Sequence, residues 1–343
     1  MKKVAVCGGA GFIGWHLCKR LRADGHYVVA YDIKYPEFAS QKEWPANEYH
    51  VFDLRNDRDY FAAFRWQEFD EVYQLAADMG GAEHVFSGKH DAEIVQNSAR
   101  INLNILDVCH RAGVNKIFFA SSACVYPTLP EWPHTTIYGN GSTQSNAACR
   151  EEDAGNPDSP YGAEKLFSEV AYASYAKQYG MEVRIGRFHN IFGPYGTWQG
   201  GREKSPAAFC RKIAETPNGG TIDCFGDGEQ TRSFLYVDEA VEGVLRLMES
   251  NFQGPVNIGS SEMVSINDLI AMIARKIAQK VIYTKPIPGP LGVRGRNSDN
   301  TLIEQKLGWK PTGKLIDGLI PTYNWISGQV EKRNKRLAEA GKG

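Results

Sequence analysis

The sequence lacks the features that mark several large classes of protein. It has no run of about 18 consecutive apolar residues, so it predicts no membrane-spanning helix. Its 39 basic and 40 acidic residues leave a formal net charge of −1, which gives no global attraction to nucleic acid. A charged ligand must therefore be held by a local group of cations.

Cysteines are few and scattered. The seven cysteines are odd in number and include no C-x-x-C pair, which favours thiols over disulfides and predicts no metal site. The apolar stretch Val4–Cys7 runs directly into glycines and is too short for the core of a secretion signal. We therefore expect a cytoplasmic protein with no metal, nucleic-acid or membrane partner.

What the sequence does contain is an alternation of short apolar runs with helix-like segments in its first half. This pattern is typical of a parallel sheet covered by helices. The expected strands are Lys3–Cys7, Tyr27–Tyr31, Glu71–Leu75, Lys116–Ala120 and Glu182–Phe188. The expected helices are Phe12–Arg22, Asn97–Ala112 and Tyr161–Tyr179.

From about Thr197 the alternation becomes less regular, which predicts a second domain. We expect a first domain over residues 1–196 and, over residues 197–331, mainly a smaller mixed α/β substrate domain with a partial return to the sheet near Phe234–Val237. Residues 332–343 are charged and predict a solvated tail. The segment 127–160 is rich in Pro, Gly, Ser, Thr and Asn, and its length favours a flap over the site.

A glycine-rich loop, Gly8–Gly14, follows the first strand and opens the first helix. In this context glycines let the backbone approach a pyrophosphate, while the first amide groups of the helix point toward its charge. The sequence therefore predicts a Rossmann-type doubly wound parallel sheet that binds a dinucleotide; a simple tight turn is the alternative. The residues expected at the cofactor in this loop are Gly8, Gly11, Phe12, Ile13 and Gly14.

Two carboxylates are candidates for the adenosine half of the cofactor. Asp32 ends the second strand, 18 residues after Gly14, where it can accept hydrogen bonds from both ribose hydroxyls and repel a 2′-phosphate. This favours NAD over NADP, although Lys34 nearby can partly offset the repulsion. Asp53 is a candidate partner of the adenine amino group, and an ordinary loop aspartate is an equal alternative.

The segment Tyr161–Lys165 places a phenol and an ammonium on one face of a helix. A cation so near favours the phenolate, so Tyr161 can remove a hydroxyl proton while Lys165 holds the phenolate and a ribose. Ser122 follows a strand end, where open α/β sheets place their ligands, and can orient a substrate alcohol. Together these residues predict hydride transfer between a sugar carbon and a nicotinamide.

Cys124 lies two residues after Ser122 and is expected in the same pocket. A thiol has an unperturbed pKa of about 8.5, close enough to neutrality for proton transfer at a carbon beside a ketone. Lys204 lies in a glycine-rich loop and can donate a proton from the opposite face; a solvated charged turn is the alternative. Lys212, Arg232 and Arg296 are cations of the second half that together can neutralise a diphosphate.

Taken together, these residues resemble the extended short-chain dehydrogenase/reductases that act on nucleotide sugars, from Lys3 to about Gln329. Within this family the chain resembles most the group of GDP-mannose 3,5-epimerases. The segments that carry the resemblance are Leu75–Gly81, Ser121–Pro127, Arg187–Pro194, Gly200–Lys212, Gly226–Phe234 and Gly292–Asn300.

The resemblance implies a mechanism without net redox change. NAD would oxidise C4 of the hexose, Cys124 and Lys204 would exchange protons at C5 and C3, and C4 would then be reduced again. It further implies that Met79, Gly80 and Gly81 face the hexose and that Asn190 positions it. Lys212, Gln230, Arg232 and Arg296 would hold the nucleotide diphosphate. The family also suggests a homodimer.

Other functions remain open. A GDP-4-keto-6-deoxymannose epimerase/reductase also uses a cysteine near this position, but it pairs the cysteine with a histidine and consumes NADPH, whereas Lys204 and Asp32 stand here. A nucleotide-sugar 4-epimerase needs neither Cys124 nor Lys204. An NAD-sensing scaffold is the non-enzymatic alternative, and the joint presence of Ser122, Tyr161 and Lys165 argues against it.

Overall fold

The protein was analysed as a computed structural model, which describes residues 1–56, 68–127, 136–137, 143–144, 148–289 and 295–340. Much of the segment 127–160 lies outside these ranges, so a flap there stays a prediction. Within the same ranges, no helix combines the length and the apolar character that a bilayer crossing requires.

A seven-stranded parallel sheet forms the centre of the larger part of the molecule. Its order is β13-β8-β5-β4-β1-β2-β3, which is the doubly wound arrangement expected from the sequence. The strands are β1 (Lys3–Cys7), β2 (Tyr27–Asp32), β3 (Glu48–Val51), β4 (Glu71–Gln74), β5 (Lys116–Ser122), β8 (Glu182–Phe188) and β13 (Val256–Ile258). The prediction of the sheet is thus confirmed.

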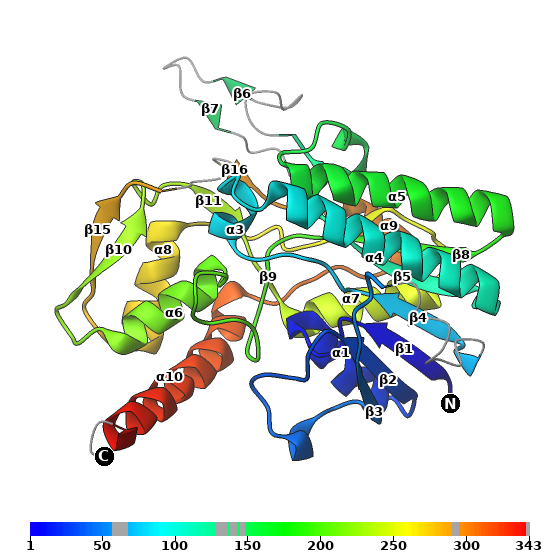
Figure 1. Ribbon diagram of the computed structural model, residues 1–343. Coiled ribbons are helices and arrows are strands. Elements are labelled where there is room, and N and C mark those ends of the chain that lie inside the picture. The colour runs from blue at the N-terminus through cyan, green and yellow to red at the C-terminus, as the bar shows by residue number, and fades with distance from the viewer. Residues whose placement is uncertain (57–67, 128–135, 138–142, 145–147, 290–294, 341–343) are drawn as a thin grey trace.

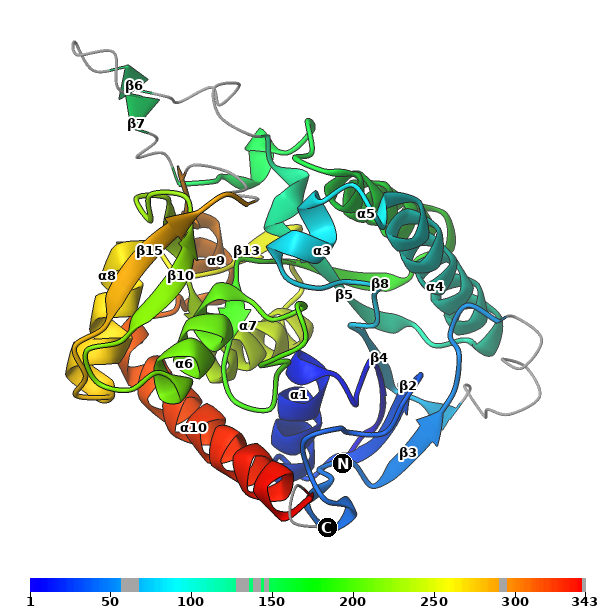
Figure 2. The ribbon, with the colours of Figure 1, turned by 60° about the vertical axis from the view of Figure 1, so that its left-hand side comes forward.

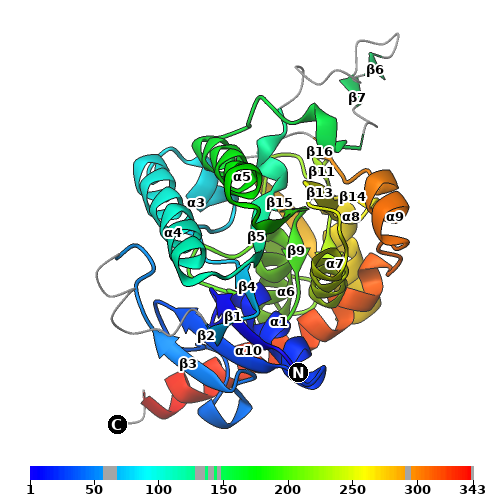
Figure 3. The same cartoon turned by 90° about the vertical axis from the view of Figure 1, so that its right-hand side faces the viewer.

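Helices cover both faces of this sheet (Figures 1 and 3). One apolar cluster joins the sheet to α4 (Asp91–Ala112) and α5 (Pro160–Tyr179), and another joins it to α1 (Phe12–Ala23), α7 (Val237–Glu249) and α9 (Thr301–Leu307). The start of α5 is well defined because Ser159 accepts a hydrogen bond from the amide of Gly162 at 3.1 Å and Pro160 is the first helical residue.

The smaller part lies beside the sheet (Figure 2). It contains α6 (Ser205–Glu215), α8 (Ile266–Ala271) with the π-helical turn Met272–Ile277, α10 (Leu315–Ala340), the pair β10 (Thr221–Phe225) and β15 (Tyr283–Ile287), and the small sheet of β14 (Met263–Ser265), β11 (Thr231–Ser233) and β16 (Gly295–Arg296). Short elements complete the description: α3 (Ala82–Phe86), β6 (Thr136–Ile137), β7 (Thr143–Gln144) and the 3-10 turns Gln41–Glu43, Ala123–Val125 and Glu151–Asp153.

One expectation about the sheet is wrong. The segment Phe234–Val237 does not return to it, because β12 (Leu235–Tyr236) pairs with β9 (Ile191–Phe192) in a separate two-stranded sheet. The chain returns later, through β13, which pairs with β8 after α7 has crossed the face of the sheet. At the other end, residues 332–340 continue α10 as a helix.

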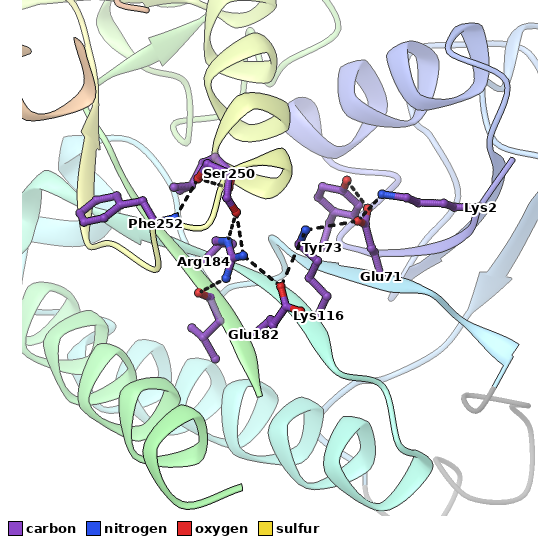
Figure 4. Close-up of polar contacts among 10 residues, drawn as sticks. Lys2, Glu71, Tyr73, Lys116, Glu182, Arg184, Ser250 and Phe252 are labelled. Atoms are coloured by element: carbon purple, nitrogen blue, oxygen red, sulfur yellow. Dashed lines mark hydrogen bonds and ion pairs between the residues drawn. The ribbon is translucent and has the colours of Figure 1, made fainter. Parts of the chain in front are cut away.

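The amino ends of the strands are joined by a chain of polar contacts (Figure 4). Glu71 of β4 is nearly buried; it pairs with Lys2 at 2.6 Å and accepts a hydrogen bond from the hydroxyl of Tyr73 at 3.0 Å. Lys116 of β5 lies 3.9 Å from both Glu71 and Glu182. These contacts stabilise the edge opposite to the one where ligands of such sheets bind.

Candidate active site

The candidate site lies at the carboxyl edge of the large sheet. The strand order reverses between β1 and β4, which is where ligands of doubly wound sheets bind. The glycine loop follows β1, the segment Asp78–Gly81 follows β4, and Ser122 ends β5. Asn190 lies just after β8. The structure thus collects at one edge residues that are widely spaced in the sequence.

The glycine loop fits the pyrophosphate of a dinucleotide. Gly8 has a φ of 80°, and a Cβ on Gly14 would overlap the carbonyl oxygen of Gly8, so the loop needs glycine at both positions. Gly11 precedes α1 and no side chain caps this helix, so the first amide groups, including those of Phe12 and Ile13, have no partner within it. They are available to an anion.

Asp32, the candidate ribose ligand, lies beside the glycine loop. It ends β2, and its Oδ2 accepts a hydrogen bond from the amide of Ala10 at 3.1 Å, which ties it to the glycine loop. Burial raises the pKa of Asp32, while hydrogen bonds from backbone amides oppose this shift. Lys34 pairs with Glu37 at 2.5 Å. The carboxylate of Glu37 thus offsets the positive charge that would otherwise weaken the preference for NAD.

Asp53 lies in the loop after β3 and has a partner within the protein. Its Oδ2 is 2.8 Å from Nη2 of Arg55, and this side-chain hydrogen bond lowers the pKa of Asp53. The Asp53 carboxylate is partly exposed and stays a candidate for the adenine amino group. Its hydrogen bonds with Arg55 already occupy part of its capacity to accept hydrogen bonds.

Tyr161, Lys165 and Ser122 are brought together, as expected. Nζ of Lys165 lies 5.7 Å from the centre of the Tyr161 ring and donates a hydrogen bond to the carbonyl of Ala120 at 3.2 Å. Burial raises the pKa of Tyr161 well above its usual value, and a hydrogen bond with Ser122 opposes this shift. Burial also lowers the pKa of Lys165. The expectation that Lys165 favours the phenolate is therefore outweighed by desolvation.

Cys124 and Lys204 lie in the same site, although they come from different parts of the fold. The amide of Cys124 donates to Oγ of Ser122 at 3.2 Å, and Lys204 immediately precedes α6. Burial, together with the charge of Asp158, raises the pKa of Cys124 to about 12. Burial lowers the pKa of Lys204, while the charge of Cys124 acts in the opposite direction. Burial thus favours the neutral thiol and the neutral amine, instead of a thiol that titrates near neutrality.

Gly81, one of the two glycines expected at the hexose, also contacts the loop before Lys204. The amide of Gly81 donates to the carbonyl of Arg202 at 2.9 Å, and a Cβ on Gly81 would overlap the carbonyl oxygen of Glu203. A Cβ on Gly80 would overlap the His84 side chain, and Met79 is exposed. Gly81 therefore helps to fix the position of Lys204.

The residues expected at the substrate come from both parts of the chain. Asn190 has a φ of 45°, which is strained for a residue with a side chain, and its Nδ2 donates to the carbonyl of Ser233 at 3.0 Å. Gln230 is buried, and its Oε1 has no hydrogen-bond partner among the described residues. Lys212 is directed to a backbone carbonyl of β10 at 2.7 Å.

The two expected arginines are neighbours on paired strands. Arg232 of β11 faces Arg296 of β16 in the parallel register. Burial lowers the pKa of Arg232 to about 10, and the positive charge of Arg296 adds to this shift. An anionic diphosphate would relieve this repulsion. Arg296 itself is buried and forms an ion pair with Asp158 at 2.7 Å.

Asp158 is a residue of the site that sequence reasoning missed. It lies beside the Cys124 thiol, directly before Ser159 and Pro160 at the start of α5. Its position before a strong helix start was visible in the sequence, but such a residue is usually only part of the turn. Its partner is 138 positions away in the chain, and no local pattern indicates that pairing.

Comparison with known proteins identifies relatives of this chain. The model of the NAD dependent epimerase/dehydratase family matches residues 4–259. GDP-mannose 3,5-epimerase 1 from Oryza sativa subsp. indica is 46% identical over 332 residues, which cover 96% of this chain and 83% of the rice protein. GDP-mannose 3,5-epimerase from Arabidopsis thaliana is 44% identical over 336 residues, covering 97% of this chain and 84% of that protein.

A solved structure shows the same fold. The UDP-glucose 4-epimerase from Thermus thermophilus, in complex with NAD, has a TM-score of 0.79 and 25% sequence identity, and the match covers 95% of this chain and 99% of that one. The present chain belongs to the NAD-dependent epimerase/dehydratase family. It is an epimerase that uses NAD, and the glycine loop with Asp32 is the part of the site that fits this cofactor.

Proposed function

We propose that the protein is a GDP-mannose 3,5-epimerase, which converts GDP-mannose into GDP-L-galactose. The observation that carries the proposal is that Cys124 packs against Tyr161 and lies within electrostatic reach of both Lys165 and Lys204. The identity of 44% and 46% to two GDP-mannose 3,5-epimerases supports it. A 4-epimerase needs only the hydride centre, whereas a 3,5-epimerase also needs groups that exchange protons at carbon.

At the hydride centre, the residues control the proton of the C4 hydroxyl. Bound NAD would supply the hydride acceptor and later return the hydride to C4. Tyr161 takes the hydroxyl proton as hydride leaves and gives it back in the reverse step, since the same group acts as base and then as acid. Ser122 orients the hydroxyl, and the charge of Lys165, 5.7 Å from the Tyr161 ring, offsets part of the cost of burying the phenolate.

At the neighbouring carbons, Cys124 and Lys204 exchange protons while C4 is a ketone. The ketone makes the C–H bonds at C3 and C5 acidic, and a neutral amine can take a proton while a neutral thiol can give one. Burial favours these neutral forms. Inversion at a carbon requires removal on one face and return on the other, which two groups on opposite sides of the ring provide.

The nucleotide diphosphate is assigned to the space between β11, β16 and α6. Arg232 and Lys212 supply charge, and Gln230 offers a buried oxygen, without a partner in the described part of the chain, that can accept a hydrogen bond from the nucleotide. Asn190 and the segment 79–81 are assigned to the hexose. Arg296 contributes charge nearby, but its hydrogen bonds already run to the protein.

The proposal is tested by incubating the full-length protein with GDP-mannose in D₂O and analysing the products by NMR. Deuterium at C5 and C3 with release of GDP-L-galactose is the expected result. Inversion at C4 without deuterium at either carbon would indicate a 4-epimerase, the second candidate, which the likeness to UDP-glucose 4-epimerases favours. Net consumption of NADPH would indicate an epimerase/reductase.

A homodimer formed through α4 and α5 is part of the proposal. These two helices lie side by side on one outer face (Figures 1 and 3), and they expose Leu103, Phe167 and Val170 by 43%, 51% and 61%. Apolar side chains gathered on paired helices are typical of an interface. Phe167→Glu should give a monomer by light scattering, whereas Leu337→Glu on α10 should leave the oligomeric state unchanged.

We also assign the protein to the cytoplasm. All seven cysteines lie in described parts of the chain and are free thiols, as expected of a protein in a reducing compartment. Fractionation of the source cells, with detection by a specific antibody, tests this assignment.

A further inference from the structure

The ion pair between Asp158 and Arg296 joins the two parts of the molecule. Arg296 lies in β16 of the smaller part, and Asp158 lies just before α5 of the larger part. Oδ2 of Asp158 is 2.7 Å from Nη1 of Arg296, and the side chains are 0% and 6% exposed. A buried pair of this kind is kept intact because separation would leave an unpaired charge in a water-poor environment.

Both partners also hold the turn that carries Cys124. The amide of Asp158 donates to the carbonyl of Cys124 at 3.1 Å. Nη1 of Arg296 donates to the carbonyl of Ala123 at 2.9 Å, and Nη2 donates to two carbonyls on the other side of Cys124, at 3.2 and 3.1 Å. The turn is thereby bound before, at and after the cysteine.

We propose that Asp158 is a positioning residue for Cys124, because its pair with Arg296 fixes the turn Ala123–Pro127 and places a carboxylate beside the thiol. The position of Asp158 beside Cys124 does not depend on the proposed function. Only the reaction that this position serves rests on it. The charge of Asp158 raises the pKa of the thiol and the charge of Arg296 lowers it. The two charges of the pair therefore act on the pKa of the Cys124 thiol in opposite directions.

Other charged groups act on the same thiol and stay constant in the test. Those within electrostatic reach of Cys124 are Tyr161 and Lys165 of α5, Lys204 before α6 and Arg232 of β11. Changing Asp158 or Arg296 one at a time therefore isolates the contribution of each partner of the pair.

The test measures the rate at which iodoacetamide alkylates Cys124 in the full-length protein with its bound cofactor, followed by mass spectrometry. The reagent can report on one site because six of the seven cysteines are buried and Cys124 is only half-buried. Asp158→Asn keeps the shape of the side chain and removes its charge. At about pH 8 its alkylation rate should rise about tenfold, since loss of a nearby carboxylate lowers a thiol pKa by about one unit.

Arg296→Gln should act in the opposite direction and slow alkylation about tenfold. A looser turn would expose the thiol and speed the reaction, so slower alkylation cannot arise from loss of structure. Asp153→Asn is the matched control, because it removes a carboxylate from the same region that is not among the main influences on the pKa of Cys124. An unchanged rate in Asp158→Asn, or a rate in Arg296→Gln that is not below that of the wild type, would overturn the proposal.

A second readout links the pair to the reaction. With GDP-mannose in D₂O, Asp158→Asn should keep oxidation at C4 and shift the pH profile of deuterium uptake at C5 to lower pH. A purely structural role would lower both steps together and leave the profile in place, which would also overturn the proposal. If the wild-type protein shows no deuterium uptake at C5, the proposed function fails. The alkylation rates still test whether Asp158 positions Cys124.

Discussion

Gly162 lies directly against the carbonyl oxygen of Cys124, so α5 and the turn with the thiol touch at a residue that has no side chain. A methyl group at this position would overlap that oxygen, which belongs to the backbone and cannot rotate away. The close approach explains how a helix that carries Tyr161 and a turn that carries Cys124 can share one small site.

Gly162→Ala should therefore displace the turn of Cys124. We expect deuterium uptake at C5 of the sugar to fall by about 100-fold, because a shift of about 1 Å at a reacting group has effects of that size. The free energy of unfolding should fall by about 1–3 kcal/mol, measured by urea denaturation. Gly328→Ala is the control, since a Cβ there meets no other atom within 4 Å and alanine favours the helix; an equal loss in both variants would contradict the explanation.

Cys124→Ala and Tyr161→Phe should separate the two kinds of chemistry. Cys124→Ala should abolish deuterium uptake at C5 and leave binding of NAD intact, because the thiol is absent but the glycine loop is unchanged. Tyr161→Phe should suppress oxidation at C4, seen as loss of absorbance from reduced cofactor. Cys109→Ala, which removes a buried thiol of α4 from the cluster behind the sheet, should keep both steps. Persistent uptake at C5 in Cys124→Ala would remove the cysteine from the mechanism.

Glu71→Gln should weaken the polar contacts at the amino edge of the sheet. Glu71 is nearly buried and bonds both Lys2 and Tyr73, so we expect a loss of about 1.5–3 kcal/mol in the free energy of unfolding. Glu68→Gln removes a partly exposed pair with Lys3, and its loss should stay below about 1 kcal/mol. Urea denaturation of the wild type and the two variants gives the comparison. A larger loss of stability in Glu68→Gln than in Glu71→Gln would show that burial does not decide how much such a pair contributes to stability.

His189 should make stability depend on pH. It is fully buried, and burial lowers its pKa from 6.5 to about 3. The unfolded state therefore binds a proton between these values that the folded state does not, so the contribution of His189 is complete above pH 6.5 and is lost as the pH falls toward 3.

The loss should be about 1.4 kcal/mol per pH unit well below pH 6.5, measured by urea denaturation at successive pH values. His189→Gln can retain the contact with Asn257 without titrating, so its stability should vary less steeply over the same range. Parallel curves for the two proteins would show that His189 does not account for the pH dependence.

The sequence was sufficient for the elements whose pattern is strong. β1 and β8 have the predicted bounds because each is a run of apolar or buried residues ended by turn residues. Two strands of the large sheet were missed for different reasons: β13 has three residues, too few for a pattern, and β3 has no buried residue. The expected return at Phe234–Val237 failed because pairing partners are decided by the tertiary structure.

Within the site, the residues that follow strand ends were predictable and the electrostatics were not. Ser122, Cys124 and Tyr161 meet because parallel strands and the following helix direct them to one edge. Burial, which controls the pKa values of Cys124 and Tyr161, depends on surrounding elements that a motif does not describe. The pairing of Asp158 with Arg296 required the fold for the same reason.

The high pKa of the Cys124 thiol bears on how the protein withstands oxidants. Peroxides attack the thiolate and convert it to sulfenic acid, whereas a protonated sulfur reacts slowly. The sulfur of Cys124 keeps its proton at neutral pH, and the remaining six are buried. The resting enzyme should therefore tolerate peroxide at concentrations that inactivate enzymes with a permanently ionised cysteine.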